Sequence, residues 1–174
     1  MGKIYSVCHY IKPTTREVLL LKNLLIHLIV LTIPSFGILP SAQATESAQT
    51  RIHAVLEAYE QALNASDVSA VLKLYTRDGV FMAQHNHPAV GIDAVKAAYQ
   101  AVFKAIDLDI KFDIREIDVI ADDWAFARTN SAGTTTINAT GDKVSEGNQE
   151  LFLLRKTPDG WKIARYIFST TNPR

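Results

Sequence analysis

The chain contains little of several residue types, and each shortage excludes a class of protein. Its 174 residues include a single cysteine, Cys8, so an internal disulfide framework and a cysteine-based zinc site are ruled out. The 18 basic residues are balanced by 18 acidic ones, without the basic surplus of a nucleic-acid-binding protein. No phosphate-binding loop, dinucleotide fingerprint, nucleophile elbow or zinc-protease motif occurs in the sequence. We therefore expect no cofactor and no nucleic-acid partner.

The one long apolar run lies near the N-terminus. Leu24–Leu39 follows Lys22, is interrupted by Pro34 and leads into the small-residue sequence at Ala42–Ala44. A basic start, an apolar middle and an A-x-A site are typical of a secretory signal peptide. The alternative is an uncleaved anchor helix, for which the run is short. We predict a signal peptide over residues 1–44, with residues 1–20 as an over-extended start, and a periplasmic or secreted bacterial domain over 45–174 that has no membrane contact after cleavage.

Within residues 45–174 the apolar side chains first follow a helical period. They recur at intervals of three and four residues over 52–63, 68–75 and 92–106. This spacing predicts three amphipathic helices. Ser66 and Asp67 supply capping residues at the start of the second helix. A short strand is expected between the second and third helices, at residues 80–83.

From Leu108 onward the apolar period changes to two, which indicates strands. The phase slips by one residue between Ile114 and Ile117, as a β-bulge would cause. Further strands are expected at 124–137, 148–156 and 161–169. A turn at 157–160 would pair Thr157 with Trp161, and hence Glu150 with Phe168. Helices followed by a long bulged antiparallel sheet predict an α+β fold with the helices on one side.

Several stretches of this domain resemble one known superfamily. Tyr59–Asp67 is similar to a helix junction of ketosteroid isomerases, and Tyr75–Phe81 to the superfamily's entry into its first strand. Trp124–Arg128, Gly147–Phe152 and Trp161–Phe168 resemble the SgcJ/EcaC-type small proteins. Over residues 48–172 the chain is identified as a member of the nuclear-transport-factor-2-like superfamily, which includes ketosteroid isomerase and the SnoaL-like polyketide cyclases. The resemblance implies a cone-shaped fold in which a curved sheet encloses an apolar pocket.

The resemblance also implies a pair of residues that bind an oxyanion. In ketosteroid isomerases a helical tyrosine and a protonated carboxylic acid on a late strand donate hydrogen bonds to a dienolate oxygen. An apolar site keeps such an acid protonated, so that it can donate. These positions fall on Tyr59 and Glu150. The catalytic base would fall on Ala83 or Gln84, neither of which can take a proton from carbon. Ordinary ketosteroid isomerisation is therefore not expected.

Each of these candidates has a simpler interpretation as well. Glu150 either faces the pocket or forms a structural ion pair with Arg128 or Arg165, and Tyr59 either contacts a ligand or only fills the core. His85 and His87 point the same way in an extended segment, so either could replace the base. They could also lie in a solvated loop. Because no third ligand stands at metal-site spacing, we expect no metal there.

Further residues are expected to line the pocket or support it. The face of one strand that carries Trp124, Arg128 and Asn130 would either line the cone or form the surface of a homodimer. The full set of expected binding residues is Phe81, Tyr99, Phe103, Trp124, Arg128, Asn130, Phe152, Tyr166 and Phe168.

The sequence leaves open whether the protein is an enzyme. The favoured interpretation is an exported protein that binds a small apolar molecule bearing a carbonyl or hydroxyl group. If it is an enzyme, we expect isomerase, cyclase or dehydratase chemistry without a cofactor. The alternative is a non-catalytic binding or dimerisation module. In either case we expect a homodimer.

Overall fold

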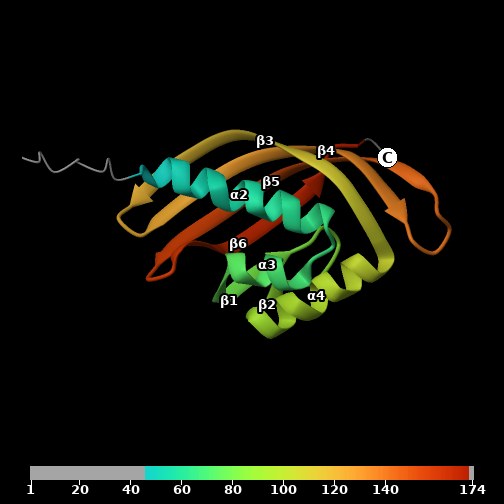
Figure 1. The fold of residues 1–174 in the computed structure, drawn as a ribbon, viewed down its shortest axis with the longest axis horizontal. Coiled ribbons are helices and arrows are strands. Elements are labelled where there is room, and N and C mark those ends of the chain that lie inside the picture. Colours follow the sequence, from blue (N-terminus) through green and yellow to red (C-terminus); the bar gives the residue numbers. More distant parts are fainter. Residues whose placement is uncertain (1–45, 173–174) are drawn as a thin grey trace, which may run out of the picture. The chain divides into compact units, whose positions relative to one another are not determined.

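A computed structural model describes residues 46–172, so the predicted signal peptide at residues 1–44 lies outside the described residues. The described chain contains three helices and one sheet of six strands (Figure 1). In the described part, no helix is long and apolar enough to span a membrane. The elements are α2 (Ala48–Asn64), α3 (Val68–Leu74), β1 (Tyr75–Met82), β2 (Ala89–Val90), α4 (Ile92–Ala105), β3 (Ile106–Ala121), β4 (Trp124–Ile137), β5 (Lys143–Thr157) and β6 (Gly160–Thr170).

The first two helices begin at side-chain caps. The Ser47 hydroxyl accepts a hydrogen bond from the Thr50 N–H at 3.1 Å, and the Asp67 carboxylate accepts one from the Ala70 N–H at 2.9 Å. Each cap satisfies a backbone donor that the first helical turn leaves free. The apolar stripe of α2 includes Ile52 and Leu56, both of which are fully buried. The three helices expected from the sequence are therefore confirmed.

The strands form one strongly curved sheet in the order β2-β1-β6-β5-β4-β3. Figure 1 shows the long strands β3 to β6 bending around α2, with α3 and α4 on the same side. Every neighbouring pair is antiparallel except β1 and β6, which run parallel. The predicted α+β cone is thus confirmed, and the expectation of an antiparallel sheet is corrected for this one pair, because β1 enters between the helices rather than through a hairpin.

Bulges and irregularities shift the register of several strands. The pairing of β3 with β4 slips between Ile114 and Glu116, where the sequence predicted a bulge. Slips that the sequence did not predict lie between Val119 and Ala121 in β3, between Tyr75 and Val80 in β1, and at Ala164 in β6. The turn at the other end pairs Thr157 with Gly160 rather than with Trp161, because a two-residue loop suffices when Gly160 adopts φ +103°.

The tight turn shifts the register of β6 by one residue from the predicted pairing, and the extra residue at the bulge, Ala164, compensates for this shift. Leu154 therefore pairs with Ile163, and both Ile163 and Ala164 are buried. Beyond the bulge the predicted register returns, with Glu150 opposite Phe168.

Polar side chains near the end of α2 fix this helix to β3. The Asn64 amide donates to the Ile110 carbonyl at 2.8 Å and accepts from the Ile110 N–H at 2.9 Å. One helical turn earlier, the Glu60 carboxylate accepts from the Phe112 N–H at 2.6 Å and from the Lys111 ammonium at 3.0 Å. These bonds satisfy backbone groups of Ile110 and Phe112 on β3, which is an edge strand of the sheet. They also hold the neighbouring Tyr59 against the inner face of the sheet.

Candidate functional site

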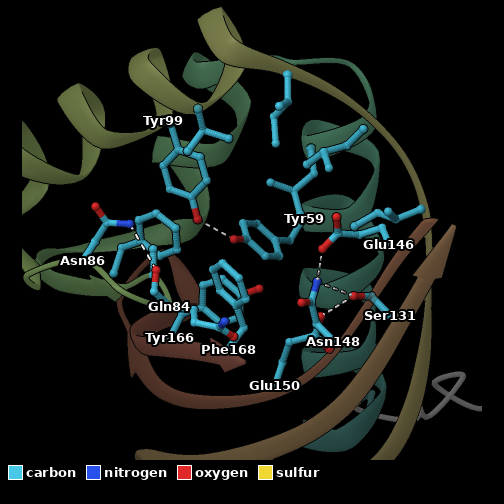
Figure 2. Close-up of a pocket in the computed structure, with 17 residues that line it drawn as sticks. Tyr59, Gln84, Asn86, Tyr99, Ser131, Glu146, Asn148, Glu150, Tyr166 and Phe168 are labelled. Atoms are coloured by element: carbon cyan, nitrogen blue, oxygen red, sulfur yellow. Dashed lines mark hydrogen bonds between the residues drawn. The ribbon is translucent and has the colours of Figure 1, made fainter. Parts of the chain in front are cut away.

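A pocket of about 210 Å³ lies between the helices and the inner face of the sheet (Figure 2). Most of its lining is apolar or aromatic, and two groups of polar side chains face into it. Sites for small molecules usually combine such a lining with a few placed polar groups. The lining residues are Tyr59, Leu63, Phe81, Ala83, Gln84, Asn86, Tyr99, Val102, Ile106, Leu108, Ile110, Ser131, Glu146, Asn148, Glu150, Tyr166 and Phe168.

The first polar group is a chain of three tyrosine hydroxyls. Tyr59 on α2 is hydrogen bonded to Tyr99 on α4, and Tyr99 to Tyr75 on β1 at 3.0 Å. All three rings are buried, and Tyr59 and Tyr99 line the pocket. Each hydroxyl has one proton to donate. When Tyr75 donates to Tyr99 and Tyr99 to Tyr59, the Tyr59 proton is left to donate into the pocket. Figure 2 shows the bond between Tyr59 and Tyr99.

Burial keeps these hydroxyls protonated. Loss of solvation raises the pKa of Tyr59 and of Tyr75 well above the ordinary value, and the neighbouring tyrosines add to this effect. The pKa of Tyr99 is raised in the same way. A neutral phenol is a hydrogen-bond donor, so this wall can stabilise a partial negative charge on a ligand oxygen.

The second polar group is centred on Glu150 of β5, whose side chain is buried. Its carboxylate accepts hydrogen bonds from the hydroxyl of Thr129 and from that of Ser131, the latter at 2.5 Å. Burial raises the pKa of Glu150; the two hydroxyls lower it and the charge of Glu146 raises it further, with a net upward shift. A carboxyl group with a raised pKa in a pocket is a candidate for proton transfer to or from a ligand.

The structure does not form either of the ion pairs considered for Glu150. The Arg128 guanidinium donates to the Glu116 carboxylate at 2.9 Å, and Arg165 donates to backbone carbonyls. The reason is the pleat of the sheet, in which successive side chains point to opposite faces. Thr129 lies opposite Glu150 on the inner face, which leaves the preceding Arg128 outside.

The polar wall extends beyond Glu150 to residues that the sequence analysis missed. The Asn148 amide donates to the Glu146 carboxylate at 2.8 Å and to the Ser131 hydroxyl at 3.4 Å, and Figure 2 shows this network. Glu146 and Asn148 precede Glu150 at intervals of two along β5. This alternation was visible in the sequence, and it would have placed all three on one face.

Four of the aromatic residues expected at the pocket line it. Phe81 stacks between Tyr99 and Tyr166, with ring centroids 4.7 and 5.6 Å away, and Phe168 packs beside Tyr166 at 5.8 Å. Burial, with Glu150 nearby, raises the pKa of the Tyr166 hydroxyl.

Two other aromatic residues lie behind the lining instead of in it. Phe152 is fully buried and stacks on Tyr166 at 4.4 Å, and Phe103 packs against Tyr99 at 5.7 Å. Both hold lining residues in place. The sequence predicted that both would contact a ligand. The structure corrects this prediction, because the rings of Tyr166 and Tyr99 lie between them and the pocket.

The strand face that carries Trp124, Arg128 and Asn130 points away from the pocket. Arg128 and Asn130 are exposed, and Trp124 lies under the Arg155 guanidinium at 5.7 Å. The small side chains of β4 face inward instead, because the helices leave little room there. Of the two alternatives for this face, the pocket lining is therefore wrong. Arg128 and Asn130 instead flank a groove on the outer surface together with Leu151 and Ile167.

The two histidines do not reach the pocket. His85 and His87 are exposed, whereas Ala83, Gln84 and Asn86 line the cavity. His85 adopts φ +62°, and its ring lies 3.4 Å from the Gln84 amide nitrogen. This backbone turn breaks the extended geometry on which their expected role as a base relied. Within residues 46–172, no three metal-ligating side chains come together.

The fold and pocket define a class of protein, a cone-shaped α+β domain with a small-molecule cavity. The model of the SnoaL-like domain matches residues 55–166, so the chain belongs to the SnoaL-like family. A search of curated proteins gives no significant match.

Several solved structures are similar to this chain. A ketosteroid isomerase-like protein from Erwinia carotovora atroseptica SCRI1043 is 39% identical, with a TM-score of 0.71 over 74% of this chain and 100% of that one. A candidate scytalone dehydratase from Novosphingobium aromaticivorans is 18% identical, with a TM-score of 0.64 over 71% and 84% of the two chains. A nuclear-transport-factor-2-like protein from Shewanella oneidensis MR-1 is 21% identical, with a TM-score of 0.57 over 71% and 99%. The superfamily that the sequence resembles is confirmed.

Proposed function

We propose that this chain is an exported protein that binds a small, mostly apolar molecule through a carbonyl or hydroxyl oxygen and acts on it as an isomerase, cyclase or dehydratase without a cofactor. One observation carries the proposal: the tyrosine hydroxyl chain and the buried Glu150 both open onto one largely apolar pocket. A donor for oxygen and a proton-transfer group in the same enclosed space suit chemistry next to a carbonyl.

In this proposal the two polar groups have separate roles. Tyr59 donates a hydrogen bond to the ligand oxygen, and Tyr99 and Tyr75 strengthen that donation through their own hydrogen bonds. Glu150 takes a proton from carbon and returns it. Two hydroxyl donors favour its carboxylate form, while burial raises its pKa and so its strength as a base. Glu150 thus takes the role that Gln84 and the distant histidines cannot fill.

A ligand screen tests this function. The protein, Tyr59→Phe and Glu150→Gln are compared by thermal shift against apolar ketones, phenols and sterol-like compounds. We expect compounds that stabilise the parent, a large loss of this shift in Tyr59→Phe, and turnover of the bound class that Glu150→Gln abolishes. Folded variants that keep the full shift, or binding without Tyr59 dependence, would contradict the proposal.

The alternative function, a dimerisation module, has support from the outer face of the sheet. Leu151 and Ile167 are cross-strand partners there, and their side chains are 40% and 44% exposed. Arg128 and Glu116 lie on the same face, so it carries both signs of charge. A face of this kind complements a second copy of itself. We propose that two copies pair through it, which is compatible with ligand binding on the inner face.

A further inference from the structure

One atom in the pocket wall is left without a partner. Asn148 is only 7% exposed and lines the cavity, and its amide nitrogen donates to Glu146 and Ser131. Its oxygen Oδ1 is also buried, yet it accepts no hydrogen bond from any residue between 46 and 172. Buried polar atoms almost always have a partner, so an unpartnered acceptor on a residue that lines the cavity points to a group that arrives with the ligand.

The orientation of this amide is fixed by its neighbours. The nitrogen lies 2.8 Å from Oε1 of Glu146, whose other oxygen accepts from the Thr135 hydroxyl at 2.8 Å. Exchanging the amide nitrogen and oxygen would set the Asn148 oxygen against a carboxylate oxygen, and neither atom could donate. The nitrogen therefore stays on Glu146, and Oδ1 remains the free acceptor.

The charges around the cavity restrict the ligand further. Glu146 and Glu150 are the charged side chains among the residues that line it, and none of these residues is lysine, arginine or histidine. A carboxylate or phosphate group would lose its water here beside like charges and without a cation. The oxygens of Glu146 and Glu150 already accept hydrogen bonds, whereas the open acceptor is a neutral amide. One neutral hydroxyl matches it better than an ammonium group with three N–H donors.

We propose that Asn148 Oδ1 forms a second contact with the ligand and accepts a hydrogen bond from its hydroxyl group. The ligand class is then a neutral hydroxylated carbonyl compound and not an acid. This inference rests on the proposed function, because it takes Tyr59 as the contact for the carbonyl oxygen.

A series on one ring skeleton tests the inference. The probes are α-tetralone, its derivatives hydroxylated at each aromatic position, and the corresponding ring carboxylates. Dissociation constants are measured by calorimetry for the protein and for Asn148→Leu. In the parent, we expect at least one hydroxytetralone to bind about three- to tenfold tighter than α-tetralone, the range of a single net hydrogen bond. The carboxylates should bind at least about tenfold more weakly than α-tetralone.

The variants locate this preference. Asn148→Leu should lose the gain for the hydroxyl and keep its affinity for α-tetralone within about twofold. The matched control is Thr135→Val, which removes the other hydrogen bond to Glu146 from a buried residue outside the cavity lining. This control should keep the gain. An equal loss in Thr135→Val would overturn the role of Asn148, and the comparison of probes on the unmodified protein stands whether or not a variant folds.

The outcomes separate this inference from the proposed function. If α-tetralone binds through Tyr59 but no hydroxyl position improves binding, or a carboxylate binds as well, the inference alone is overturned. If Tyr59→Phe leaves α-tetralone binding unchanged while the Asn148-dependent gain persists, the second contact stands and the carbonyl contact fails. If no compound of the series binds although the wider screen yields a ligand that depends on Tyr59, the inference alone is overturned. If neither the series nor the screen yields a ligand, both are overturned.

Discussion

Thr129 and Glu150 lie directly opposite each other on β4 and β5, and the Thr129 hydroxyl donates a hydrogen bond to the Glu150 carboxylate. Ser131, two residues along the same strand, donates to the other carboxylate oxygen. The cone therefore buries an acidic group with two hydroxyl donors instead of a cation. Because burial outweighs these donors, the pKa of Glu150 stays above its ordinary value of 4.5.

This shift makes stability depend on pH. The folded state holds the Glu150 proton more tightly than the unfolded chain, so the free energy of unfolding should fall as pH rises from 4.5 through the raised pKa and then level off. Glu150→Gln removes this dependence and should gain stability relative to the parent across that window. Thr129→Val, which lacks the donor, should extend the window to higher pH, whereas Thr129→Ser should not. Urea unfolding at a series of pH values measures all four proteins, and parallel curves would contradict the argument.

The tyrosine chain predicts a graded loss of ligand binding. For a ketone found in the screen, Tyr59→Phe should weaken affinity about tenfold, because it removes the donor itself. Tyr75→Phe should weaken it about two- to threefold, since it acts only through Tyr99. Titration calorimetry measures both effects. A larger loss in Tyr75→Phe than in Tyr59→Phe, with both variants folded by circular dichroism, would be inconsistent with this direction of donation.

The position of the histidines predicts that neither takes part in the reaction. His85→Ala and His87→Ala should each leave ligand affinity and turnover within about twofold of the parent, since neither side chain lines the pocket. The acid limb of a pH–rate profile should also be unchanged, because Glu150 and not an imidazole carries the proton. If His85→Ala lost the acid limb of the profile, His85 and not Glu150 would be the base.

The contacts between α2 and β3 predict a local loss of stability. Asn64→Ala removes two hydrogen bonds to Ile110 and should lower the free energy of unfolding by about 1–2 kcal/mol. The control is Gln61→Ala, at an exposed position of the same helix, which should change it by less than about 0.5 kcal/mol. Chemical unfolding gives both values. Equal effects would mean that Asn64 contributes only helix propensity.

The proposed dimer makes a prediction about mass. The parent should sediment as a dimer, and Leu151→Arg or Ile167→Arg should sediment as a monomer, because each places a charge at the centre of the outer face. Val144→Arg is the control, since Val144 is 43% exposed but points to the opposite side of β5. Sedimentation equilibrium measures the mass of all four proteins. A monomeric parent would leave the outer face without this role.

The fold could be predicted well because it depends on periodicity. Helical spacing located α2, α3 and α4, and the phase slip after Ile114 located a bulge in β3. The parallel pairing of β1 with β6 could not be read in this way, because it joins the first and last strands of the domain and leaves no local pattern.

The site was predicted less completely, for two physical reasons. Which face of a strand points inward depends on what packs against it, so the large residues around Arg128 could not be assigned from alternation alone. The loop after β1 turns at a positive φ on His85, and neither His85 nor His87 lines the cavity, which the sequence pattern does not indicate. Tyr59 and Glu150 were predicted through a resemblance to a known family. Asn148 was not predicted, because the role of an asparagine in a strand depends on its hydrogen-bond partners, which the sequence does not show.

The bulge in β6 has a consequence for how this domain tolerates changes in length. Before Ala164 the inward side chains are those of Trp161 and Ile163, and after it they are those of Tyr166 and Phe168. Loss of one residue from a regular stretch of the strand would act as a frameshift acts on a message, because every side chain beyond it would exchange inside for outside. Loss of Ala164 itself would only remove the bulge and keep Tyr166 and Phe168 inside. Length variation among relatives of this chain should therefore collect in the turns and at the bulge, while the regular stretches of the long strands keep their residue count.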